Sequence, residues 1–178
     1  MPTRAATHGD IAVLVELMTD FYRESSFSLP RESAKAVFEQ LLTDPALGRV
    51  WICEQGREAA GYIVLTFGFS VEYGGRDAFV DDLFIRPAFR GRGLGKQLLD
   101  TLIGECAHLR VRALHLEVDR SHDRAHALYR SRGFRDNDRR LLTMKLSGAI
   151  HESHGSQEKG QVDSLPSGGS NHRGGDHE

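Results

Sequence analysis

A glycine-rich basic run at residues 90–96 constrains this chain more than any other stretch. It follows an apolar, strand-like segment at 78–85 and precedes leucines at helical spacing. Alternating glycines let a backbone turn tightly and bring its N–H groups against a ligand. The positive end of a helix dipole at the same point favours an anion. We therefore predict a phosphate-binding loop formed by Arg90, Gly91, Arg92, Gly93, Leu94, Gly95 and Lys96.

Two common phosphate-binding patterns do not match this run. A dinucleotide-binding fold requires G-x-G-x-x-G early in the chain and an acidic residue about 20 positions later. The glycines here are spaced G-x-G-x-G and lie in mid-chain. A nucleoside-triphosphate loop requires G-x-x-x-x-G-K-S/T, but the interval from Gly91 to Gly95 is too short and Gln97 replaces the Ser or Thr. By spacing alone, a turn that only begins a helix also remains open.

A second segment, 114–134, reads as a strand, a loop, a helix and a glycine stop, and it contains Leu128-Tyr129 and Gly133-Phe134. Together the two segments resemble the GNAT superfamily of acyl-CoA-dependent N-acetyltransferases. The pyrophosphate loop of that family has the pattern Arg/Gln-x-x-Gly-x-Gly/Ala, and its later segment often ends in Leu-Tyr-x-x-x-Gly-Phe. The resemblance covers most of residues 1–147. It implies an α/β (α+β) fold with a mixed, mostly antiparallel central sheet flanked by helices.

The composition indicates one soluble globular domain. The 178 residues are 39% hydrophobic and 27% charged, with a net charge of −2, which gives no sign of a nucleic-acid or membrane partner. We expect a cytoplasmic protein, with Cys53 and Cys106 as free buried thiols. No Cys/His spacing suggests a metal site. We expect the acetyltransferase domain to span 1–147 and the Gly/Ser/His-rich stretch 148–178 to be a disordered tail, because it has few large apolar residues.

Apolar periodicity predicts the elements around the loop. We expect a helix capped by Asp10, a strand that ends in the glycine run, and a helix with a buried stripe of Leu94, Leu98, Leu102 and Cys106. The remaining expected elements are strands at 3–7, 50–54 and 60–69, a helix at 30–42, hairpin turns at 55–57 and 74–75, and a closing strand at 141–146.

The resemblance also implies the chemistry. Transfer of an acetyl group from a thioester to an amine needs a bound cofactor, a deprotonated amine, a stabilised oxyanion and a protonated leaving thiolate. The co-substrate would be acetyl-CoA, with backbone groups of Leu83, Phe84 and Ile85 pairing with its pantetheine arm. Tyr129 would protonate the thiolate. His122 stands where the family often has an Asn that binds pantetheine; it can replace that Asn, narrow the acyl pocket, or lie exposed.

Three acids are candidates around the acceptor amine. Asp81 and Asp82 are adjacent in an apolar strand, so we predict that they face opposite sides of the sheet. This stretch resembles the polyamine acetyltransferases, which have an acid where Asp81 stands and use it to draw the proton from the amine. Glu117 is a further candidate base. For each acid the alternative is a structural ion pair.

The walls of the acceptor site are expected from the first two helices and from the hairpin before the central strand. They would include Tyr22, Glu24, Glu72 and Tyr73, together with Asp82. Acids mixed with aromatics suit a small cationic amine. A protein lysine or N-terminal amine is an alternative acceptor, and a non-catalytic acyl-CoA-binding module is an alternative function. Many relatives pair, so we also expect a homodimer.

Overall fold

The structure, a computed structural model, describes residues 3–25 and 29–146. The chain divides into a compact unit that ends at Arg135 and a second unit that begins at Asp136. The described residues of the second unit, 136–146, form no helix or strand. The predicted closing strand at 141–146 is therefore wrong, because alternating apolar residues do not make a strand without a partner backbone. The predicted tail, 148–178, lies outside the described residues.

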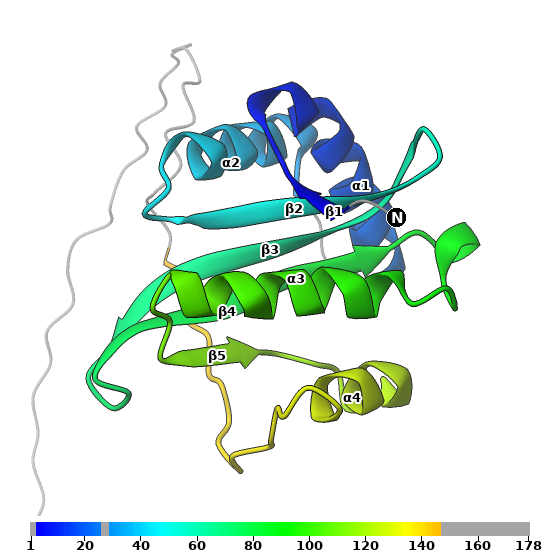
Figure 1. Ribbon diagram of the computed structural model, residues 1–178. Helices are drawn as coiled ribbons and strands as arrows, with labels where there is room; N and C mark the ends of the chain where they lie inside the picture. The colour runs from blue at the N-terminus through cyan, green and yellow to red at the C-terminus, as the bar shows by residue number, and fades with distance from the viewer. Residues whose placement is uncertain (1–2, 26–28, 147–178) are drawn as a thin grey trace, which may run out of the picture. The chain divides into compact units, whose positions relative to one another are not determined.

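A five-stranded sheet forms the centre of the compact unit (Figure 1). The strands are in sequence order across the sheet: β1 (Thr3–Ala5), β2 (Gly48–Gln55), β3 (Glu58–Ser70), β4 (Gly75–Ile85) and β5 (Ala113–Leu116). The first three pairings are antiparallel, and β4 pairs with β5 in parallel. The parallel step requires a crossover, which α3 supplies. The predicted mixed, mostly antiparallel sheet is confirmed.

Helices cover both faces of the sheet (Figure 1). Helices α1 (Ile11–Glu24) and α2 (Arg31–Thr43) lie on one face, and α3 (Leu94–His108) lies on the other. Helix α4 (Asp123–Arg130) follows β5, and short 3-10 turns precede α1 and α3 at His8–Asp10 and Pro87–Phe89. The α3 crossover carries the chain from the end of β4 to β5, so the glycine run lies at the end of β4.

Alternation along the strands produces two apolar cores. One core packs Val50, Ile52, Tyr62 and Val64 against α1 and α2. The other packs the intervening residues Trp51, Cys53, Ile63 and Leu65 against α3. The predicted stripe of α3 is confirmed, since all four of its residues are buried in this second core.

The start of α1 differs from the expectation. Asp10 makes no side-chain cap of α1; it closes the 3-10 turn, where its carboxylate accepts a 2.7 Å bond from the Thr7 N–H. The Arg4 guanidinium also donates to this carboxylate at 2.7 Å and holds the pKa of Asp10 well below its usual range. The sequence correctly placed Asp10 at the start of a helix. It did not predict that the Asp10 carboxylate would bind Arg4 of β1.

Candidate active site

A β-bulge in β4 brings two adjacent carboxylates to one face of the sheet. Val64 of β3 pairs with Asp82. The next residue of β3, Leu65, pairs with Val80, which leaves Asp81 as an extra residue in β4. Asp81 and Asp82 consequently both line a pocket against α1 and α2. The prediction that they face opposite sides is wrong, because it assumed an unbroken two-residue alternation.

A buried tyrosine holds Asp82. The Tyr62 hydroxyl donates a 2.6 Å hydrogen bond to the Asp82 carboxylate, and Tyr62 is fully buried. Burial raises the pKa of Asp82 to about 6; the bond from Tyr62 opposes this shift and the nearby charge of Asp81 adds to it. Burial also raises the pKa of Tyr62, so the phenol stays protonated and remains a donor.

Asp81 is the more accessible carboxylate of the pair. It keeps an exposed surface, yet the protein atoms around it displace enough water to raise its pKa. Tyr22 lies at the same corner of the pocket, and burial, followed by the charges of Asp82 and Asp81, raises its pKa to about 12. An ammonium placed here would meet two carboxylates, and a raised pKa makes each a better proton acceptor than an ordinary carboxylate.

Part of one edge of β4 has no strand beside it. The pairing of β4 with β5 runs only from Asp77 to Val80, whereas its pairing with β3 continues to Ile85. Figure 1 shows the chain leaving β5 toward α4 while β4 continues toward the glycine run. In the described part of the chain, no strand pairs with this edge of β4 beyond Val80.

Along β4, the backbone N–H and C=O groups of successive residues point alternately toward β3 and toward the open edge. The Phe84 carbonyl faces β3, where a Cβ added to Gly61 would collide with it. By alternation, the backbone groups of Leu83 and Ile85 face the open edge. The Ile85 carbonyl already accepts a 2.8 Å bond from Arg90. Of the three residues predicted to pair with pantetheine, Leu83 therefore has the most suitable position.

The glycine run turns the chain from β4 into α3. Gly91 and Gly93 have φ angles of +77° and +78°, a conformation that strains any residue with a Cβ. Gly93 is the N-cap of α3, and the Gln97 N–H donates a 3.0 Å bond to the Gly93 carbonyl. The N–H groups before Gln97 have no partner within the helix. Together with the helix dipole, they form the backbone geometry of an anion site.

The Arg90 side chain is directed back toward the protein. Its guanidinium donates to the Glu24 carboxylate at 2.6 Å and lies 5.7 Å from the centre of the Phe84 ring. Glu24, predicted to line the acceptor site, therefore contacts Arg90 beside the glycine run. The Arg90 side chain positions the loop, and the backbone is left to face a ligand.

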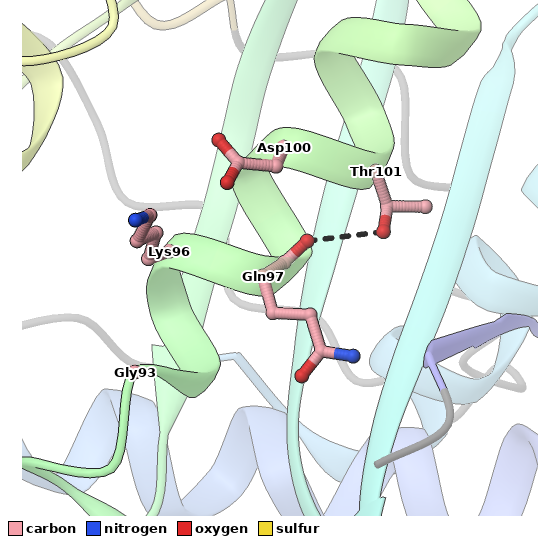
Figure 2. Close-up of a pocket in the computed structure, with 5 residues that line it drawn as sticks. All are labelled: Gly93, Lys96, Gln97, Asp100 and Thr101. Carbon is pink, nitrogen blue, oxygen red and sulfur yellow. Dashed lines mark hydrogen bonds between the residues drawn. The ribbon is translucent and has the colours of Figure 1, made fainter.

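Lys96 has a different environment on the outer surface of α3. Figure 2 shows Lys96 and Asp100 projecting from the same side of the helix, one turn apart. With Gly93, Gln97 and Thr101 they line an open depression of about 420 Å³. The Thr101 hydroxyl donates to the Gln97 carbonyl at 3.0 Å. The Lys96 ammonium is a cation on this surface, and the Asp100 carboxylate is paired with the Arg132 guanidinium. The depression adjoins the N-cap of α3, so it extends the candidate anion site outward.

Tyr129 lies on the α3 side of the sheet. Its ring packs edge-on against Phe134, with centroids 5.8 Å apart, and both rings contact the core that contains Val80 and Leu98. Burial raises the pKa of Tyr129. Among residues 3–25 and 29–146, its hydroxyl has no hydrogen-bond partner. A protonated phenol thus lies on one face of the sheet and two acids lie on the other.

The hairpin residues predicted to line the acceptor site lie elsewhere. Glu72 and Tyr73 are in the turn between β3 and β4, at the opposite end of β4 from the glycine run (Figure 1). The Tyr73 ring packs against His115 of β5 at 5.3 Å. Neither residue lines the pocket that contains Asp81.

Two predicted residues follow β5. Glu117 is exposed just beyond the strand, and it does not line the pocket of Asp81. His122 is the exposed N-cap of α4, and its backbone N–H donates to the Asp119 carbonyl at 2.9 Å. Both residues lie in or beside the connection from β5 to α4, and neither lines the pocket that contains Asp81 and Asp82.

Sequence reasoning missed the residues that give the pocket its shape. Tyr62 was not selected, although a tyrosine within an aliphatic strand signals a hydroxyl that needs a partner. The apolar walls of the pocket were also missed. Residues that line a pocket recur along a helix at the same spacing as residues of the core, so the pattern does not distinguish them. These walls are Met18, Leu29, Val37, Phe38, Leu41, Leu47 and Val64.

No group of three or more His, Cys, Asp or Glu side chains among residues 3–25 and 29–146 could hold a metal ion. No helix among them is long and apolar enough to cross a membrane.

Comparisons with known proteins agree on the family. Residues 12–134 match the family model described as "Acetyltransferase (GNAT) family". The chain is 28% identical over 138 residues to a protein of Archaeoglobus fulgidus described as an uncharacterized N-acetyltransferase, covering 76% of this chain and 93% of that protein.

Solved structures show the same fold. An integron cassette protein from the mobile metagenome of Cole Harbour Salt Marsh has a TM-score of 0.75 and 47% identity, covering 84% of this chain and 93% of that one. A protein of Clostridium acetobutylicum described as a predicted acetyltransferase, solved with acetyl-CoA, has a TM-score of 0.69 and 20% identity, covering 80% of this chain and 95% of that one. Because the family model spans the sheet from β2 onward, the glycine run and α4, this chain belongs to the GNAT family and is an acetyltransferase.

Proposed function

We propose that the protein transfers an acetyl group from acetyl-CoA to a primary amine. The observation that carries this proposal is the open edge of β4, which leads directly into the glycine run and has acids on one face and Tyr129 on the other. An extended ligand laid along this edge would have its phosphates at the N-terminus of α3. A relative of the same fold that contains acetyl-CoA supports this choice of ligand.

The chain offers contacts for each part of acetyl-CoA. Backbone N–H groups from Gly91 to Lys96 would bind the pyrophosphate, and the depression beside Lys96 would receive the nucleotide end. The backbone of Leu83 would pair with the pantetheine arm, and its N–H would face the thioester oxygen. His122 would lie across the open edge from β4. No side chain of this set needs a metal.

The acid and base would act on opposite sides of the thioester. Asp81 would take a proton from the acceptor ammonium, and its raised pKa suits it to that task. The amine nitrogen would then form a bond to the thioester carbon as the C–S bond breaks. Tyr129 would give its proton to the leaving thiolate; a raised pKa keeps that proton on the phenol until it is needed.

A small acceptor is favoured over a protein chain. The acids lie in a pocket whose walls come from α1, α2 and the sheet. A peptide would need an extended groove past the same acids, whereas this pocket has a volume of about 160 Å³. The pocket therefore supports a small molecule that enters by its amino group.

The substitution Tyr129→Phe tests this mechanism. It removes the phenolic proton and keeps the ring that packs on Phe134. We expect kcat for thiol release from acetyl-CoA to fall by about a hundredfold or more. Acetyl-CoA affinity, measured by calorimetry, should stay within about twofold. A variant with wild-type kcat would remove Tyr129 from the mechanism. If the wild-type protein did not bind acetyl-CoA at all, the proposed function would be overturned.

A further inference from the structure

The acceptor pocket has an uneven distribution of charge. Its ionisable lining groups are Asp81 and Asp82 from β4 and the phenol of Tyr22. The lining that faces them from β3, α1 and α2 is mainly aliphatic and aromatic. No Lys, Arg or His belongs to the described lining. A ligand in this pocket would therefore have its charge at the β4 side and an apolar group elsewhere.

The size of the pocket limits that apolar group. Its volume is about 160 Å³. An apolar protein cavity of about 150 Å³ holds one benzene molecule. One phenyl ring, or a branched chain of similar volume, would fill the space between the acids and the helices. Burial contributes roughly 0.8 kcal/mol for each methylene, equivalent to about fourfold in affinity.

The same lining excludes other common amines. A second ammonium on the α2 side of the pocket, among Val37, Phe38 and Leu41, would have no carboxylate from that helix, since Gln40 is the polar residue that α2 adds to the described lining. An unpaired charge in apolar surroundings is costly. The carboxylate of an amino acid would lie near two acids and meet no cation. An amino sugar would bring several hydroxyl groups to a lining with few partners.

We propose that the acceptor is a primary amine with a single compact apolar group, such as an arylalkylamine or a branched alkylamine. This inference rests on the proposed function and specifies its substrate. Val37 and Leu47, at the exposed rim of the pocket, would determine the preference for an uncharged group, because they are the apolar lining residues that solvent reaches most freely.

Matched pairs of amines test the proposal with the full-length protein. Butylamine and 1,4-diaminobutane differ only by the second ammonium, and 2-phenylethylamine and phenylalanine differ only by the carboxylate. At about pH 8, where Asp82 is ionised, we expect kcat/KM to be at least about tenfold higher for the first member of each pair. Equal or higher values for the diamine or the amino acid would overturn the proposal.

A charge placed at the rim gives a sharper test. Val37→Asp would supply a counter-ion for a second ammonium, so the ratio of kcat/KM for 1,4-diaminobutane to that for butylamine should rise by about tenfold. Val71→Asp is the matched control: it makes the same change at a residue 92% exposed in the β3–β4 turn, away from the pocket. We expect that control to leave the ratio unchanged. If Val37→Asp left this ratio of kcat/KM values unchanged, the rim residues would not determine the preference for an uncharged group.

A binding measurement separates this proposal from the proposed function. If no amine gives thiol release, the proposed function fails. Calorimetric titration with amines in the absence of acetyl-CoA then shows whether the pocket still prefers an apolar amine. Tighter binding of 2-phenylethylamine than of 1,4-diaminobutane, lost in Val37→Asp, would support the apolar-amine pocket as a binding site. No binding of either amine, or tighter binding of the diamine, would overturn it.

Discussion

Asp82 lines the proposed acceptor pocket, and its carboxylate accepts a hydrogen bond from the hydroxyl of the buried Tyr62. Burial of the carboxylate raises its pKa from the usual 3.8 to about 6. The folded protein therefore binds this proton more tightly than the unfolded chain does. The resulting contribution to stability is fully present below about pH 4 and is lost as the pH rises through about 6.

The direction of this pH dependence can be measured by comparing the wild type with Asp82→Asn, whose side chain at position 82 cannot ionise. We expect the free energy of unfolding of the wild type, relative to the variant, to fall by at most about 3 kcal/mol between about pH 4 and pH 7.5. Chemical denaturation at both pH values gives this difference. Asp10, whose pKa is lowered, is present in both proteins and cancels in the comparison. A constant difference would mean that the pKa of Asp82 is not raised.

The choice of base is also a question of single residues. Asp81 lines the acceptor pocket and Glu117 does not. We therefore expect Asp81→Asn to lower kcat/KM by about a hundredfold and Glu117→Gln to change it by less than about threefold. Steady-state rates of thiol release at saturating acetyl-CoA compare the two variants. A larger loss in Glu117→Gln would transfer the role of base to that residue.

At the scale of elements, the glycine that caps α3 and the glycine within it at position 104 have opposite effects on stability. Gly93, its N-cap, has a φ of +78°, so Gly93→Ala should destabilise the protein by about 1–2 kcal/mol. It should also weaken acetyl-CoA binding as the loop shifts. Gly104 lies in the exposed part of the helix, where a Cβ meets no atom within 4 Å, so Gly104→Ala should stabilise by about 1 kcal/mol.

Thermal unfolding and calorimetric titration with acetyl-CoA measure both glycine variants. Gly104→Ala is the control, because it makes the same chemical change in the same helix without affecting the loop. If Gly93→Ala were as stable as the wild type and bound acetyl-CoA normally, the left-handed geometry of the N-cap would not be required.

At the scale of the whole molecule, the compact unit ends at Arg135, whereas the sequence predicts a domain that extends to 147. The domain boundary at 147 stays a prediction. We expect a chain ending at residue 147 to retain activity and to unfold within about 2 °C of the full chain, corresponding to less than about 1 kcal/mol. A larger loss would show that residues 148–178 contribute to the fold. Light scattering on both chains would also test the predicted homodimer.

Local patterns in the sequence were sufficient for most elements. The glycine run, the stripe of α3 and the hairpin turns all depend on contacts or dihedral angles within a few residues. They were predicted close to their observed positions, as was the helix that contains Tyr129. The fold family followed from a resemblance that rests on two such motifs, the glycine run at 90–96 and the segment that contains Tyr129.

The pocket that contains Asp81 and Asp82 depended on tertiary structure. The bulge at Asp81 is a property of the pairing between β3 and β4, so it appears only when the two strands are aligned. The partner of Asp82 is Tyr62, 20 residues away in the chain. The sequence by itself therefore determined the fold family, through its motifs, and the glycine turn before α3, whose causes are local. Only the tertiary structure decided which acids share a pocket and which apolar residues face them, because burial and strand register arise from contacts between distant segments.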